Sequence, residues 1–255
     1  GKSYAYTEYI HYYDHKEHKQ LMMEQELEKE MENALAERQF YIVIQPKYDP
    51  NTESIVGGET LVRWQHPIKG FMSPGDFIPV FEKNGFIIQL DYFVWEETCR
   101  LISKRKQEGK KNVPISVNVS RSHFYGCDLM NKLNELVEKY DLDTKDLELE
   151  ITESLCGDGA DEIYSKIYEL RENGFKIAMD DFGSGYSSLN MLKEMHLDIL
   201  KMDLKFLEGD GEKSHLILKS LIEMAQAMEL KVVVEGVEEL EQVEFLSQFK
   251  GCILQ

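Results

Sequence analysis

The sequence predicts an α/β fold, a TIM-like (β/α)8 barrel with an antiparallel first strand. Eight strand-like segments recur along the chain, and most are separated by amphipathic helical patterns. The first two segments are joined by a turn that is too short for a crossover helix, so they form an antiparallel hairpin. A length of 255 residues also suits one barrel of this class.

The expected strands are short apolar or β-branched runs bounded by turn residues. They cover residues 40–47, 55–63, 114–119, 147–152, 176–181, 198–202, 231–235 and 251–255. The expected helices carry apolar residues at helical spacing and cover residues 86–106, 129–140, 160–172, 187–195, 214–228 and 238–249. An open doubly wound sheet is the alternative, but no Gly-x-Gly-x-x-Gly follows an early strand.

Residues 14–39 predict a long charged helix, with Leu27, Met31 and Leu35 at a spacing of four. We interpret it as a solvated connecting helix without catalytic content. The expected division is a linker region over residues 1–38 and a barrel domain over residues 39–255.

Composition excludes some classes of partner. A formal charge of −18 is unsuited to a duplex nucleic-acid surface, which needs a basic face. It is compatible with a small anionic ligand if bound metal ions invert the local field. The four cysteines form no zinc or Cys-x-x-Cys spacing, which favours a reducing compartment, and no apolar run approaches 18 residues. We expect a cytoplasmic location, without membrane insertion by this segment.

Polar side chains recur at the C-terminal ends of the predicted strands, where the active sites of barrel enzymes lie. The most informative case is Asp180-Asp181, which follows a buried strand and precedes a glycine-punctuated loop. The others are Glu59, Asn118, Glu150, Glu153, Lys201, Glu235 and Gln255. This set is rich in hard oxygen ligands and contains no histidine, which indicates Mg²⁺ or Mn²⁺ rather than Zn²⁺.

The motifs around these residues resemble those of the EAL domains, a family of cyclic di-GMP phosphodiesterases. Glu59-Thr60-Leu61 resembles the signature that gives the family its name, with Thr60 in place of alanine. The other matching motifs begin at Asn118, Glu150, Asp180, Leu200 and Val234 and follow in the family's order. The resemblance covers residues 30–255 and implies a barrel that hydrolyses cyclic di-GMP to linear 5′-pGpG with two Mg²⁺ or Mn²⁺ ions.

The resemblance also implies roles for individual residues. The metal ligands would be Glu59, Asn118, Glu150, Asp180, Asp181 and Glu235, with Asp180 shared between the ions. Lys201 would orient the attacking water and offset phosphoryl charge, and Glu153 would support the loop after the aspartate pair. Glu59, Lys201, Asp181 and Glu153 are therefore the expected catalytic set. The nucleotide contacts would be Gln45, Leu61, Arg63, Asn118, Asp181 and Gln255.

The chain departs from the family pattern at its end. The family places its glutamine four residues after the cysteine of the last strand, whereas Gln255 follows Cys252 by three. The sequence also stops there, so we expect a domain truncated at its C-terminus. The resemblance further implies a homodimer that pairs through the helix after the aspartate loop, and an upstream GGDEF domain.

Other interpretations stay open at this level. An EAL-like barrel could bind cyclic di-GMP without cleaving it, a glycosidase-type barrel could use an acid and a nucleophile, and the long helix could serve as a scaffold. From sequence alone, Arg63 could pack at the barrel rim. Lys201 could form a structural ion pair with Asp203 or Asp181.

Overall fold

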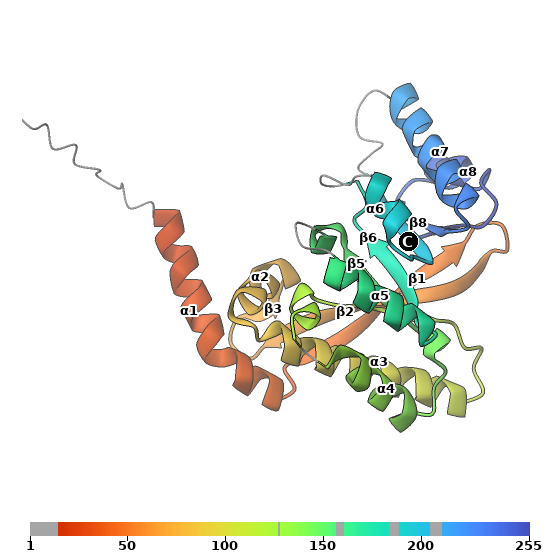
Figure 1. Cartoon of the computed structure of the whole chain (residues 1–255). Coiled ribbons are helices and arrows are strands. Elements are labelled where there is room, and N and C mark those ends of the chain that lie inside the picture. The colour runs from red at the N-terminus through yellow and green to blue at the C-terminus, as the bar shows by residue number, and fades with distance from the viewer. Residues whose placement is uncertain (1–14, 127, 157–160, 184–188, 205–210) are drawn as a thin grey trace, which may run out of the picture.

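A closed β-barrel organises the chain (Figure 1). The computed structural model describes residues 15–126, 128–156, 161–183, 189–204 and 211–255, so Cys127 and residues 184–188 lie outside the described residues. Within these, eight strands close the barrel in the order β1, β9, β8, β7, β6, β5, β4, β2 and back to β1. Their bounds are β1 Phe40–Asp49, β2 Ser54–His66, β4 Ile115–Asn118, β5 Leu147–Thr152, β6 Lys176–Asp180, β7 Ile199–Asp203, β8 Lys231–Glu235 and β9 Cys252–Leu254.

The first strand runs against the rest of the barrel. β1 pairs antiparallel with β2 on one side and with β9 on the other, whereas the remaining neighbours from β2 to β9 are parallel. The turn between β1 and β2 starts at Asp49, whose carboxylate accepts hydrogen bonds from the backbone N–H groups of Asn51 and Thr52. The barrel and its reversed first strand, both predicted from the sequence, are confirmed.

Helices surround the barrel, except that the N-terminal half of the first helix projects away from it (Figure 1). They are α1 His15–Ala36, α2 Pro74–Asn84, α3 Ile87–Gln107, α4 Leu129–Lys139, α5 Asp161–Glu172, α6 Leu189–Glu194, α7 Gly211–Ala227 and α8 Leu240–Leu246. Short 3₁₀ turns lie at Arg121–Phe124, Thr144–Asp146 and Glu153–Cys156. Among the described residues, no helix has the length and apolarity that a membrane crossing requires.

Two elements were missed by the sequence analysis, β3 (Gly70–Met72) and α2. β3 pairs antiparallel with the end of β2 and begins at Gly70, which has a φ of +76° directly after the turn 67–69. α2 begins at Pro74 and contains Pro79, so its sequence reads as a loop although proline is well tolerated in the first turn of a helix.

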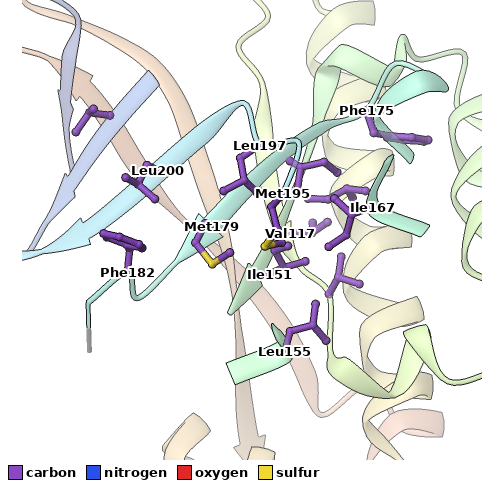
Figure 2. Close-up of a cluster of buried hydrophobic side chains, with 14 of the residues drawn as sticks. Val117, Ile151, Leu155, Ile167, Phe175, Met179, Phe182, Met195, Leu197 and Leu200 are labelled. Carbon is purple, nitrogen blue, oxygen red and sulfur yellow. The ribbon is translucent and has the colours of Figure 1, made fainter. Parts of the chain in front are cut away.

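The strands alternate between an apolar outer face and an inner face that carries the polar residues. In β5, Leu147, Leu149 and Ile151 belong to the buried core between sheet and helices, and Glu148 and Glu150 alternate with them. Figure 2 shows Val117, Ile151 and Met179 of neighbouring strands in the same buried cluster as Ile167 of α5. Inside the barrel, Ala178, Ile199 and Val233 form a small apolar cluster of their own. The inner face is therefore apolar in one part and polar in another.

The second half of α1 packs against the barrel domain rather than standing free in solvent. Leu27 is completely buried and shares a core cluster with Phe40, Trp64 and Phe77. Glu30 of α1 also pairs with buried His66 of β2, whose Nε2 lies 2.7 Å from the carboxylate. The interpretation of this helix as solvated is thus wrong for its C-terminal half, whereas the division of the chain at residue 38 stays a prediction.

Candidate active site

Six side chains from six strands meet inside one end of the barrel. The strands are parallel, so their carboxyl ends lie at the same rim, and alternation turns the polar residue of each toward the axis. The connected side chains are those of Glu59, Asn118, Glu150, Asp180, Lys201 and Glu235. All six are residues predicted from the sequence, and the structure brings them together.

Lys201 lies at the centre of this group. Its Nζ is 2.9 Å from Glu59 Oε2, 2.8 Å from Glu150 Oε2, 3.1 Å from Asp180 Oδ1 and 2.6 Å from Glu235 Oε1. The side chain is 1% exposed. These four carboxylates, and not the Asp203 or Asp181 considered from the sequence, are the partners that the structure gives it.

The carboxylates decide the charge of this lysine. Burial alone lowers the pKa of Lys201, but the four carboxylates outweigh burial and raise that pKa well above its ordinary value. Its ammonium therefore keeps its proton at neutral pH. A group in this state donates hydrogen bonds and neutralises charge, but it cannot accept a proton.

Glu59 is held from three sides. Lys201 contacts its Oε2, the Gln255 amide donates to the same oxygen, and the Asn118 amide lies 3.4 Å from Oε1. Gln255 therefore reaches the site despite its shortened spacing from Cys252. Its buried Oε1 has no hydrogen-bond partner within the described part of the chain.

The two side chains of the aspartate pair have different environments: that of Asp180 lies in the site, and that of Asp181 is exposed to solvent. Asp180 ends β6 and contacts Lys201, whereas Asp181 is exposed and has a φ of +56° in the left-handed region. Oxygen atoms of Asp180, Asp181 and Glu235 nevertheless lie within 4.8 Å of one another. Glu153 accepts a hydrogen bond of 3.1 Å from the backbone N–H of Gly183, which fastens the turn after the pair.

The crowding of acids leaves this site short of positive charge. Burial raises the pKa of Asp180 to about 7, against the opposing effect of Lys201 and with support from neighbouring carboxylates. Burial likewise raises the pKa of Glu235. For Glu150, Lys201 and Lys47 outweigh burial and lower the pKa. A buried group of carboxylate and amide oxygens is the kind of donor set that fits a divalent cation with a preference for hard oxygen ligands.

Two cavities adjoin the acidic group and share Leu61. The smaller one, about 310 Å³, is lined by Gln45, Glu59, Asp180, Asp203, Glu235, Gly236 and Gln255 in addition to Leu61. The larger one, about 510 Å³, lies beside it and includes Arg63, Asn118, Arg121 and Tyr125. Arg63 therefore lines a cavity, while its Nη1 donates to the Val62 carbonyl at 2.8 Å. Together these cavities offer two neighbouring spaces beside the carboxylates.

The sequence did not predict the residues that contact the site residues from outside the acidic cluster. Lys47 of β1 is buried and contacts Glu150 Oε1 at 2.9 Å. Trp95 of α3 donates from Nε1 to the Asn118 carbonyl at 2.9 Å, and Asp91 of α3 accepts from the Ser120 backbone. A usable signal existed only for Lys47, because a lysine inside an apolar strand requires an acidic partner.

Comparisons with known proteins give a family match over most of the chain. A family model described as the EAL domain matches residues 28–255. MucR of Pseudomonas aeruginosa, named a bifunctional diguanylate cyclase/cyclic di-GMP phosphodiesterase, is 34% identical over 225 residues, which are 88% of this chain and 33% of that protein. NbdA of the same organism, named a cyclic di-GMP phosphodiesterase, is 35% identical over 227 residues, which are 88% of this chain and 29% of NbdA. The chain thus spans about a third of the length of these relatives.

Solved structures match over most of the chain. A structure titled PaMucR phosphodiesterase, c-di-GMP complex, superposes with a TM-score of 0.83 at 34% identity, and the match covers 90% of this chain and 94% of that one. The EAL enzyme Bd1971 in its cGMP-bound form gives a TM-score of 0.84 at 30% identity, with 94% and 67% covered. The barrel and the order of its strands therefore have experimentally solved counterparts.

Proposed function

Because this chain belongs to the EAL domain family, we propose that it is a metal-dependent phosphodiesterase that hydrolyses cyclic di-GMP to linear 5′-pGpG. The observation that carries the proposal is the ammonium of Lys201 held by carboxylates from four separate strands, at 2.6–3.1 Å. This arrangement gathers negative charge at one point of the barrel rim and keeps one cation fixed among it. It suits chemistry on a phosphodiester once further cations are bound.

The ligands of those cations would be Glu59, Asn118, Glu150, Asp180, Asp181 and Glu235. The cluster of Asp180, Asp181 and Glu235 supports a place for one ion, and the contact of Asn118 with Glu59 supports a second group beside it. When bound, two Mg²⁺ or Mn²⁺ ions would supply Lewis-acid stabilisation of phosphate charge and a lowered pKa for the attacking water. The number of ions is part of the proposal.

The chain's own residues would orient and stabilise the reacting groups. In the reaction, the oxygen of water bonds to phosphorus and the P–O3′ bond breaks. A proton from that water ends on the 3′ oxygen, which leaves as a hydroxyl, and the phosphate stays on the 5′ oxygen. Lys201, which carries its proton at neutral pH, would donate hydrogen bonds and offset phosphate charge. Glu153 would hold the turn that carries Asp181 through its bond to Gly183.

The two adjoining cavities would bind the dinucleotide. Their volumes of about 310 and 510 Å³ lie within the range of small-molecule sites. Gln45, Leu61 and Gln255 line the cavity at the carboxylates, and Arg63 lines its neighbour. The smaller cavity would hold the scissile phosphodiester, and the larger one would accept a guanosine with Arg63 in reach of a phosphate.

A product assay with matched variants tests the proposal. The protein is incubated with cyclic di-GMP in Mg²⁺ or Mn²⁺, with and without EDTA, and the nucleotides are separated by chromatography. We expect 5′-pGpG only with metal, and its loss in Glu59→Ala but not in Glu138→Gln, an exposed carboxylate on α4. Binding of cyclic di-GMP without a product in any metal would instead identify a receptor that senses the nucleotide.

Assembly and location belong to the same proposal. We expect a homodimer that pairs through α6, which follows the aspartate loop, and a cytoplasmic site of action, where the nucleotide would be encountered. Sedimentation equilibrium of the wild-type chain measures the first. A monomer at all concentrations would remove the dimer from the proposal without affecting the chemistry.

A further inference from the structure

Lys47 occupies an unusual place for a charged residue. It lies on β1 and points into the barrel, where aliphatic side chains usually fill the space. It is 2% exposed, and its stem runs past Gly57, where an added Cβ would lie 3.4 Å from Lys47 Cδ. The lysine stem therefore packs directly against the backbone of Gly57.

The ammonium of Lys47 has three donors, and each has an acceptor. Nζ lies 2.9 Å from Ser116 Oγ, 2.9 Å from Glu150 Oε1 and 3.4 Å from Glu148 Oε2. Ser116 and Glu150 are completely buried, and Glu148 is 5% exposed. An ammonium saturated in this way is fixed in orientation, because any rotation would leave a buried donor or acceptor unpaired.

The two oxygens of Glu150 consequently have different surroundings. Oε1 accepts a hydrogen bond from Lys47, which lies outside the cluster of carboxylates around Lys201. Oε2 lies 2.8 Å from Lys201, at the centre of that cluster. Glu150 therefore presents one oxygen to the site and has the other occupied. Nothing in the strand itself would enforce this division, since a free carboxylate can offer both oxygens to a cation.

We propose that Lys47 is a specificity-determining residue that restricts Glu150 to a single oxygen ligand and thereby favours Mg²⁺ or Mn²⁺ over Ca²⁺. Ca²⁺ takes six to eight oxygens and readily uses both oxygens of a carboxylate, whereas Mg²⁺ requires near-octahedral geometry with few ligands from each group. The inference rests on the proposed function, because it assumes that Glu150 is a metal ligand. It concerns selectivity between two ions of equal charge, so the charge lost with Lys47 affects both ions alike.

The test measures metal binding without substrate. Bound Mn²⁺ is followed by electron paramagnetic resonance on the complete chain, and Ca²⁺ is added until half of it is displaced. In Lys47→Met, Glu150 Oε1 is released, and the Ca²⁺ needed for half-displacement should fall about tenfold, the scale typical of changes in groups that orient metal ligands.

Two further variants make the result specific. Glu148→Gln removes a charge from the same cluster but keeps an acceptor for Lys47 and its bond to Glu150, so half-displacement should stay within about twofold of the wild type. Lys47→Met with Glu148→Gln avoids leaving Glu148 unpaired and should show the same shift toward Ca²⁺ as the single variant. If Lys47→Met fails to fold, the same displacement measurement is made on this double variant.

The outcomes separate this inference from the proposed function. If the wild type binds Mn²⁺ and the folded Lys47 variants keep the wild-type ratio, the inference about Lys47 is overturned and the phosphodiesterase proposal stands. If the wild type itself binds no Mn²⁺, the metal-dependent mechanism fails and the inference fails with it. A shift toward Ca²⁺ of the same size in Glu148→Gln would also contradict it, because that change leaves Glu150 bonded to Lys47.

Discussion

Replacement of Glu153 by alanine tests how the turn after the aspartate pair is held. The Glu153 carboxylate accepts a hydrogen bond of 3.1 Å from the N–H of Gly183, two residues after Asp181. Asp181 has a φ of +56°, which costs a residue other than glycine on the order of 1–3 kcal/mol. The bond from Glu153 acts against this cost, so its loss should let the turn relax away from the site.

The size of the effect follows from the type of bond. A hydrogen bond to a charged group contributes about 1.5–3 kcal/mol, and partial exposure of this one places it in the lower half of that range, about 1.5–2 kcal/mol. This is comparable to the cost of the Asp181 conformation. If turnover needs the turn in place, Glu153→Ala should lower kcat by about 10- to 30-fold.

The assay is formation of 5′-pGpG at saturating Mn²⁺ and substrate, compared among three proteins. Glu153→Gln keeps an acceptor without the charge, so it should lose about fivefold or less. Circular dichroism and a cooperative urea transition establish that both variants are folded. A folded Glu153→Ala with turnover within twofold of the wild type would refute the role assigned to this bond.

Three further predictions concern the helix, the thiols and the acidic group. Leu27→Ala, at a fully buried position of α1, should lower the free energy of unfolding by about 2–5 kcal/mol in urea titrations. Leu21→Ala, at a half-exposed position of the same helix, should change it by less than about 0.5 kcal/mol. Equal effects of the two substitutions would mean that α1 does not pack as described. Burial raises the pKa of Cys99 and of Cys252 to about 12, so neither should react with iodoacetamide at pH 8 until urea unfolds the chain, and rapid labelling of either in the native state would contradict this environment. The pKa of Asp180 in the metal-free protein is raised to about 7, so a proton competes with the metal ion for this carboxylate. The affinity for Mn²⁺, measured by calorimetry, should therefore fall steadily from pH 7.5 to 5.5. A constant affinity over this range would mean that Asp180 has an ordinary carboxylate pKa.

Some of the fold was readable from local pattern alone. The turn after Asp49 is too short for a helix, so the sequence alone predicts that β1 is antiparallel to β2. The β3 strand and the α2 helix were not readable, because three residues give no period and two prolines obscure a helical pattern. Burial of Leu27 was hidden for a different reason: only the partner surface around Trp64 makes that face of α1 a core face.

The acidic site also has features that the sequence predicts and features that only the tertiary structure decides. Alternation along each strand is a local property, so the residues that face the barrel axis, such as Glu150 and Lys201, could be selected from the sequence. Which of them touch one another depends on the stagger between strands and on closure of the barrel, which no single segment encodes. That closure made four carboxylates the partners of Lys201, and the reversed direction of β1 placed Lys47 against Glu150. The sequence therefore determined the chemical groups available to this protein, and the tertiary structure decided their pairing, because contacts between distant strands are set by register rather than by local preference.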